Sequence, residues 1–194
     1  MTPRAEKRQL RKAMVQRILA LSAADREAQE AELTARFASL PGYAEAGTVL
    51  LYVTAFPEEI VTWAMLATAL GQGKRVLCPR VDRASHRLRL FRVEDLESSF
   101  QAGVLGIPEP HDGCLEVLPE EVDWVLVPGL AFDAQRYRLG RGAGHYDRLL
   151  PQLRPGTPRW ALAFDCQLVE SLPVEPHDVA LDGVVTLRQS GERP

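Results

Sequence analysis

The residues with the clearest chemical potential lie between positions 136 and 150, in the stretch RYRLGRGAGHYDRLL. This stretch combines three glycines, Gly140, Gly142 and Gly144, with four arginines, Arg136, Arg138, Arg141 and Arg148. Glycines let a backbone adopt positive φ angles and approach a ligand closely, so that successive N–H groups can point at an anion. Guanidinium groups supply forked donors for phosphate or carboxylate oxygens. The combination predicts a binding site for a polyphosphate.

The glycine pattern by itself is a weak signal. It is not the phosphate loop G-x-x-x-x-G-K-[ST], because no Lys-Ser or Lys-Thr pair follows it. It is not the dinucleotide fingerprint either, because its third glycine comes one residue too early. A glycine-rich connection that carries solubilising arginines is therefore an alternative. The position of the stretch, straight after the apolar run WVLVPGLAF, favours the phosphate site.

A second group of basic residues lies near the N-terminus. The segment from Thr2 to about Leu21 begins with a suitable cap and has apolar residues at helical spacing, so we predict an amphipathic helix. Within it, Arg4, Lys7 and Arg11 stand at positions i, i+3 and i+7, which places their side chains on one flank. A solvated basic face is the simpler interpretation. The same flank could equally reach a phosphate.

These two groups must be positioned by the elements of an α/β fold. Ser22 and Asp25 have capping-box spacing and predict a second helix. The predicted strands that follow are TVLLYV, RVLCPRV, RLRLFRV, DWVLVPG, RWALAF and DGVVT, and the later helices are EEIVTWAMLATAL and HYDRLLPQL. Continuous apolar runs separated by helices indicate a mostly parallel sheet buried on both faces, hence a three-layer α/β/α fold. Ligands of such sheets bind beyond the carboxyl ends of the strands, where the glycine stretch lies.

The chain as a whole narrows the class of protein. Its 194 residues, 46% of them hydrophobic, are enough for one buried core, so we expect a single domain over residues 1–194. No apolar run is long enough to cross a bilayer, and three widely spaced cysteines suggest neither a disulfide framework nor a zinc site. We therefore expect a cytoplasmic protein. A monomer is also expected. A net charge of -3 gives no overall attraction to nucleic acid or to membranes.

Three separated segments carry a resemblance to a known family. They are KRQLR, VPGLAFDAQRYRLGRGAGHYDRLL and LPVEPHDVALDGVVT, in that order along the chain. Together they resemble 5-formyltetrahydrofolate cyclo-ligases, from Lys7 to Thr186. The resemblance implies the fold shared by sugar-phosphate isomerases and CoA transferases. It also implies an ATP-dependent, magnesium-dependent cyclisation of 5-formyltetrahydrofolate to 5,10-methenyltetrahydrofolate through a phosphorylated formyl group, with small molecules as the only partners.

The resemblance also implies roles for residues at matching positions. Arg141, Lys7 and Arg11 would neutralise charge on the moving phosphoryl group. The positions implied to contact ATP are Lys7, Arg8, Gln9, Leu10, Arg11, Arg138, Leu139, Gly140, Arg141, Gly142, Ala143, Gly144, His145 and Tyr146. The positions implied to contact the folate are Thr54, Glu59, Arg141, Gly142, Ala143, Gly144 and His145. Glu58 is next to Glu59, so either glutamate could fill that role, and both could instead lie in an acidic first turn of a helix.

Asp147 and Asp178 match family positions associated with magnesium, whose hard carboxylate ligands can be combined with phosphate oxygens. Their simpler interpretations are a helix-start aspartate and a turn aspartate. His145 and Leu105 stand where the family usually has aromatic residues. These two departures keep open a noncatalytic nucleotide- or folate-binding module. A sugar-phosphate isomerase or CoA transferase-like enzyme, with Glu59 as base or nucleophile, is the other alternative.

Overall fold

The computed structural model describes residues 3–103 and 106–188, and its centre is a mixed, mostly parallel sheet. The sheet has seven strands in the order β11-β10-β7-β1-β2-β3-β6. Their bounds are β1 Thr48–Leu50, β2 Arg75–Asp82, β3 Arg87–Val93, β6 Glu116–Val117, β7 Trp124–Leu126, β10 Arg159–Leu162 and β11 Gly183–Val185. The strands from β11 to β2 pair in parallel, whereas β3 and β6 are joined antiparallel at one edge. The predicted α/β class is confirmed.

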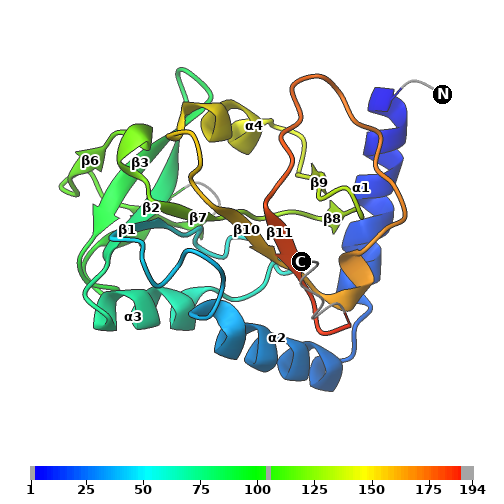
Figure 1. Ribbon diagram of the computed structural model, residues 1–194, viewed down its shortest axis with the longest axis horizontal. Helices are drawn as coiled ribbons and strands as arrows, with labels where there is room; N and C mark the ends of the chain where they lie inside the picture. The colour runs from blue at the N-terminus through cyan, green and yellow to red at the C-terminus, as the bar shows by residue number, and fades with distance from the viewer. Residues whose placement is uncertain (1–2, 104–105, 189–194) are drawn as a thin grey trace.

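Alternate residues of the central strands serve the two faces of the sheet. Val49 and Leu51 belong to one buried apolar cluster, whereas Leu50 and Leu77 belong to a second one. This alternation explains why the run TVLLYV is apolar throughout, since side chains of successive strand residues point to opposite faces and both faces are covered. Figure 1 shows α2 (Ala23–Phe37) and α3 (Trp63–Gly71) below the sheet, and α4 (His145–Leu149) above it.

The first two helices begin and end close to where their sequences predict. In α1 (Pro3–Leu19), Met14 and Ile18 are buried, and the helix ends two residues before the predicted limit. Thr2, the predicted cap, lies outside the described residues. Ser22 caps α2 by accepting a hydrogen bond from the Asp25 backbone N–H at 3.0 Å. Among the described residues, no helix is both long and apolar enough to span a membrane.

Three local predictions are wrong. The helix predicted from Glu58 begins only at Trp63, so the two glutamates lie in a connection before α3 and not in its first turn. The glycine stretch does not follow β7 directly, because a small antiparallel hairpin of β8 (Ala131–Phe132) and β9 (Arg138–Leu139) intervenes. Apart from the main sheet, β5 (Pro108–Pro110) pairs antiparallel with β4 (Phe100–Ala102). The helix predicted over HYDRLLPQL is only five residues long in α4 and continues as a short 3-10 turn.

Candidate functional site

The two predicted anion-binding groups meet at one cavity of about 450 Å³. It lies beyond the carboxyl end of β7, where residues 128–130 line it, as expected for a parallel sheet. Its other walls come from α1, from the glycine stretch and from the connection after η4 (Asp165–Gln167), which Figure 1 shows running alongside α1. The charged lining residues are Arg4, Lys7, Arg11, Glu59, Arg138, Arg141, Asp147, Glu175 and Asp178. Cations therefore converge on this cavity although the chain is acidic as a whole.

The basic flank of α1 faces the cavity. Arg4, Lys7 and Arg11 all line it, which confirms their predicted common face. Arg8 instead lines a more open groove next to the cavity, together with Arg11 and Arg141. Gln9 and Leu10 are not among the lining residues of either hollow, because helical geometry turns them to other faces. Leu10 packs against the apolar core.

Lys7 is held in an ion-pair cluster with the connection that follows η4. Its Nζ donates hydrogen bonds to Glu175 Oε2 at 2.8 Å and to Asp178 Oδ2 at 2.6 Å. Burial by itself would lower the pKa of Lys7, but the two carboxylates raise it above its ordinary value. Burial works against ionisation of Asp178, yet the hydrogen bond from Lys7 brings the pKa of Asp178 below its ordinary value. The lysine is therefore charged and fixed at the edge of the cavity.

The glycine stretch adopts the backbone conformation that its composition predicts. Gly142 has φ 107° and Gly144 has φ 66°, both in a region that other residues rarely adopt. A Cβ at Gly142 would also come within 3.2 Å of Arg11 Cζ, so the loop and α1 approach each other closely. Arg11 Nε donates to the Gly140 carbonyl at 2.8 Å. The two halves of the predicted phosphate site are thus in direct contact.

Arg138 is the most deeply buried cation of the cavity. Its side chain is 3% exposed, and it donates to Asp147 Oδ1 at 2.6 Å. Its Nε is buried without a hydrogen-bond partner among the described residues, and burial lowers the pKa of the guanidinium. The Arg138 Cζ atom lies 5.6 Å from the centre of the Tyr146 ring. A buried, incompletely satisfied guanidinium that lines a cavity is well suited to meet an anionic ligand.

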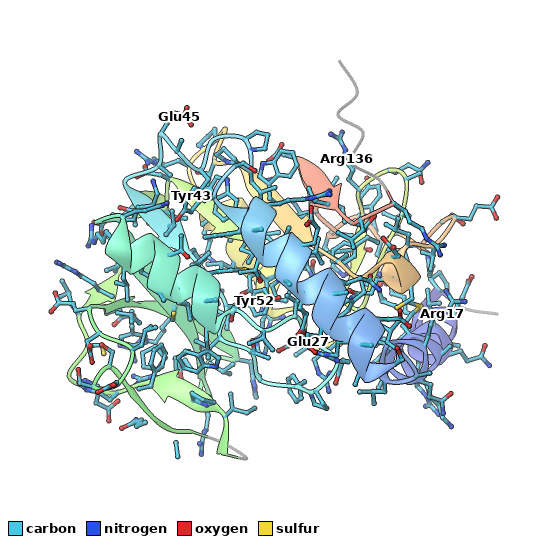
Figure 2. All side chains as sticks on the ribbon, turned by 90° about the horizontal axis from the view of Figure 1, so that it is seen from below. Arg17, Glu27, Tyr43, Glu45, Tyr52 and Arg136 are labelled. Atoms are coloured by element: carbon cyan, nitrogen blue, oxygen red, sulfur yellow. The ribbon has the colours of Figure 1, made fainter. Side chains whose placement is uncertain are left out.

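The structure separates two other arginines of the stretch, Arg141 and Arg136. Arg141 lines the cavity, forms an ion pair with Glu58, and lies with its Cζ 3.5 Å from the centre of the Phe56 ring. Arg136 is not among the lining residues, so its predicted role as an anion ligand is wrong. It donates to the Asp182 carbonyl at 3.0 Å, and Figure 2, where Arg136 is labelled, shows it beside β11. The β8–β9 hairpin turns Arg136 away, because it sits at a positive φ of 68° just before β9.

The connection before α3 brings one glutamate to the cavity. Glu59 lines it, and its Oε2 accepts hydrogen bonds from the backbone N–H groups of Ala55 and Phe56 at 2.8 and 3.2 Å. Burial raises the pKa of Glu59 despite these two hydrogen bonds. Glu58 is not among the cavity-lining residues and is occupied with Arg141. Of the two neighbouring candidates, the geometry therefore favours Glu59 as the one that can meet a ligand.

Thr54 is not among the lining residues of the cavity. Its hydroxyl donates to the Ile60 carbonyl at 3.0 Å, and its backbone N–H donates to the Thr62 hydroxyl at 3.2 Å. Thr54 thus joins the start of the connection to its end, just before α3 begins. A direct contact of Thr54 with the folate stays a prediction.

His145 lines the cavity at the start of α4, and its Nδ1 is 3.1 Å from the His86 carbonyl oxygen. Burial is the largest influence on this ring and lowers the pKa of His145 below its ordinary value. The imidazole is therefore neutral at pH 7 and presents an uncharged ring to the cavity. Leu105, the other departure from the family pattern, lies outside the described residues.

Asp147 and Asp178 are the two carboxylates predicted for magnesium, and both line the cavity. Among residues 3–103 and 106–188, no group of three or more potential ligands is arranged to hold a metal by itself. Each aspartate already meets a cation with one oxygen, Asp147 through Oδ1 and Asp178 through Oδ2. Two carboxylates suit magnesium only if water and phosphate oxygens complete the coordination, which is how the ion is commonly bound in nucleotide sites. The donor set fits that shared arrangement.

Sequence reasoning missed one charged residue of the site. Glu175 lines the cavity and shares Lys7 with Asp178. The available signal was its position in the same Pro-rich segment as Asp178, EPHDVALD. In the structure, the Glu175 N–H donates to Asp178 Oδ2 at 2.7 Å, which places both carboxylates in one turn. His177, between them, also lines the cavity.

Comparisons with known proteins agree with one another. The model of the 5-formyltetrahydrofolate cyclo-ligase family matches residues 3–187. A protein named 5-formyltetrahydrofolate cyclo-ligase from Mycolicibacterium smegmatis is 36% identical over 189 residues, which are 96% of this chain and 95% of the relative. One of the same name from Escherichia coli K12 is 34% identical over 88% of this chain and 94% of the relative. The solved structure of Aquifex aeolicus 5,10-methenyltetrahydrofolate synthetase superposes with a TM-score of 0.79 at 30% identity, covering 97% of this chain and 96% of that one.

Proposed function

The chain belongs to the 5-formyltetrahydrofolate cyclo-ligase family, and we propose that the cavity between α1 and the glycine stretch is the place where it carries out the reaction of that family. The protein is a ligase that uses ATP to convert 5-formyltetrahydrofolate to 5,10-methenyltetrahydrofolate. In the mechanism we propose, the γ-phosphoryl group of ATP passes to the formyl oxygen and ADP forms. N-10 of the folate then attacks the activated carbon, and the C–O bond breaks with release of phosphate.

The meeting of the two basic segments in one cavity is the observation that carries this proposal. An amide-like oxygen is a poor leaving group until it is phosphorylated, so the protein must hold both substrates together and neutralise charge on the phosphoryl group. Lys7 and Arg11 reach the cavity from α1, and Arg138 and Arg141 reach it from the glycine stretch. We assign to them the binding of the ATP phosphates, with Arg141, Lys7 and Arg11 stabilising the transferred group.

The backbone N–H groups of the glycine stretch add uncharged donors to this clamp. Gly142 and Gly144 leave the loop without Cβ atoms at the two positions of positive φ, so a phosphate can approach the main chain closely. The basic side chains then supply positive charge, while the loop backbone provides a surface that a phosphate can approach closely. Leu139, Ala143 and Tyr146 complete the wall on this side of the cavity.

For magnesium we propose Asp147 and Asp178 as ligands, each through the carboxylate oxygen that is not paired with a cation. When bound, magnesium would neutralise charge on the ATP phosphates. Arg138 and Lys7 hold the two carboxylates in place by the ion pairs described above. This arrangement makes the same aspartates serve both the fold and the nucleotide.

For the folate we propose Glu59 as the residue that binds the pterin. A carboxylate can accept two hydrogen bonds from a ring N–H and its neighbouring amino group. One oxygen of Glu59 is fixed by the N–H groups of Ala55 and Phe56, which sets the orientation of the group. His145, a neutral ring on the opposite segment, is placed to contact the same substrate.

We also propose that the chain is a single-domain monomer of the cytoplasm. One continuous sheet uses strands from residue 48 to residue 185, which supports a single folding unit. Cys78, Cys114 and Cys166 are all free thiols, in keeping with a reducing compartment. The elution volume of the purified chain by size exclusion with light scattering tests the monomer.

The experiment that tests the function is the appearance of methenyltetrahydrofolate absorbance after purified protein is mixed with 5-formyltetrahydrofolate and Mg-ATP. We expect absorbance only when both ATP and magnesium are present. Arg141→Gln should abolish most of the activity. Arg136→Gln is the matched control, because Arg136 belongs to the same stretch but does not line the cavity. Binding of both substrates without any absorbance change would instead support the noncatalytic module.

A further inference from the structure

An ion pair between a buried carboxylate and a partly exposed arginine ties the glycine stretch to the connection before α3. Glu58, with a side chain only 3% exposed, pairs with Arg141, whose own side chain is 42% exposed. Arg141 also lies over the Phe56 ring, with its Cζ 3.5 Å from the ring centre. A planar guanidinium held by a carboxylate and an aromatic face has little freedom to rotate. These two contacts therefore fix the orientation of the Arg141 guanidinium as well as the position of its charge.

The connection that holds Arg141 is itself firmly anchored. Arg26 of α2 donates to the Pro57 carbonyl and to the Glu59 carbonyl, both at 2.6 Å. The Thr62 hydroxyl is fully buried and donates to the Tyr52 carbonyl at 2.8 Å, at the end of the central-strand run. The connection is thus bound to α2 on one side and to the sheet on the other. It forms a fixed platform beside the cavity.

The part of the glycine stretch from Gly140 to Gly144 is held mainly at its two ends. Gly142 and Gly144 have the backbone freedom that positive φ requires, and that freedom must be restrained before the loop can act as a binding surface. Arg11 holds the Gly140 carbonyl, and Arg148 holds the Ala143 carbonyl at 2.9 Å. The position of Arg141, between these two attachments, depends on a residue from outside the loop.

We infer that Glu58 is a positioning residue: together with Phe56 it holds Arg141 in the orientation needed to meet the transferred phosphoryl group. This inference rests on the proposed role of Arg141. Because Glu58 and Glu59 are neighbours, the same short segment fixes the cation for the phosphoryl group and the carboxylate for the folate. Adjacent residues on one platform thereby set the positions of the two substrates relative to each other.

The first test is Glu58→Gln, which keeps the side-chain shape and removes the charge. Arg141 then loses its partner, and we expect kcat to fall about tenfold, because misplacing a contact group by about 1 Å can cost up to about a hundredfold in rate. The stability of the fold should change little, since removing a buried carboxylate also removes its desolvation cost. A purely structural glutamate would give the opposite pair of results, with lower stability and unchanged kcat.

A double-mutant cycle tests whether Glu58 acts through Arg141. We expect Glu58→Gln to have no further effect on kcat in an Arg141→Gln background, because the group that it positions is absent. Phe56→Leu removes the aromatic face but keeps apolar bulk, and should lower kcat about threefold without affecting folding. Because Phe56 is only half-buried, this variant keeps the inference testable even if the Glu58 variant folds poorly.

The matched control is Glu116→Gln. Glu116 of β6 pairs with Arg89 of β3, and Arg89 Cζ lies 5.3 Å from the centre of the Phe91 ring, so the same three residue types occur away from the cavity. This control should leave kcat and KM unchanged. If Arg141→Gln inactivates the enzyme while Glu58→Gln and Phe56→Leu keep full kcat, the inference is overturned and the proposed function stands. Full activity of Arg141→Gln would overturn the role of Arg141 itself.

Discussion

Replacing Asp147 by Asn separates a role in holding the fold from a role in binding magnesium. The Asp147 carboxylate is the hydrogen-bonded ion-pair partner of Arg138, whose side chain is 3% exposed. The Arg138 Nε already lacks a hydrogen-bond partner within the described residues. Asp147→Asn would therefore leave a buried guanidinium without a charged partner. The variant should be destabilised even when no nucleotide or metal is present.

The size of this effect follows from the burial of the pair. Breaking a buried ion pair by removing one partner typically costs about 3–5 kcal/mol. Asn keeps one acceptor oxygen for Arg138, and the Asp147 side chain is 20% exposed, so we expect the lower figure of about 2–3 kcal/mol here. For a chain of this length, each kcal/mol shifts Tm by about 2–4 °C, which gives a fall of about 4–12 °C.

The assay is urea and thermal unfolding of the parent and the variant in the absence of ATP and magnesium. Asp112→Asn is the control, because Asp112 pairs with Arg80 while its own side chain is 89% exposed. That exposed pair should contribute less than about 1 kcal/mol. An Asp147→Asn protein as stable as its parent, but inactive, would refute the structural part of this reasoning and leave Asp147 with a purely ligand-binding role.

Three further predictions concern the cavity. Glu59→Gln should weaken folate binding about tenfold or more by titration calorimetry, because a hydrogen bond to a charged group is lost, and an unchanged Kd would remove Glu59 from the site. His145→Tyr should preserve or improve folate affinity, since the burial that lowers the pKa of His145 already leaves a neutral ring at pH 7, and a clear loss of affinity would refute this. The Lys7 cluster should stabilise the fold between about pH 4 and pH 10. Because the pKa values of Asp178 and Glu175 are lowered, this stability is lost as the pH falls through them. Because the pKa of Lys7 is raised, the stability is also lost at high pH. The urea midpoints of Lys7→Met and the parent should therefore converge at acid pH.

The features that sequence reasoning obtained correctly are those encoded by local spacing. The period of α1 placed Lys7 and Arg11 on one flank, and the glycines at 142 and 144 indicated a loop with positive φ. Strands such as β1 and β7 were visible because their apolar runs are continuous. These signals depend on neighbours in the chain, so no tertiary information was needed to read them.

The features that sequence reasoning missed depend on contacts between distant segments. The β8–β9 hairpin has strands of only two residues, too short for any periodicity, and it sends Arg136 away from the cavity while Arg138 turns inward. The pairing of Arg141 with Glu58 joins segments that are far apart in the chain. The choice between Glu58 and Glu59 could not be made from adjacency alone, because a connection without helical or strand periodicity does not say which side chain faces inward.

The ion pair between α1 and the segment after η4 has a consequence for how the protein folds. Lys7 is separated from Glu175 by 168 positions and from Asp178 by 171. Contacts between such distant positions form late, because the entropy of closing a long loop must be overcome first. During synthesis, α1 emerges with its cations exposed and finds these carboxylates only after position 178 has left the ribosome. The nucleotide clamp is therefore completed late, and a chain that stops before position 175 cannot form the ion pairs of Lys7 with Glu175 and Asp178.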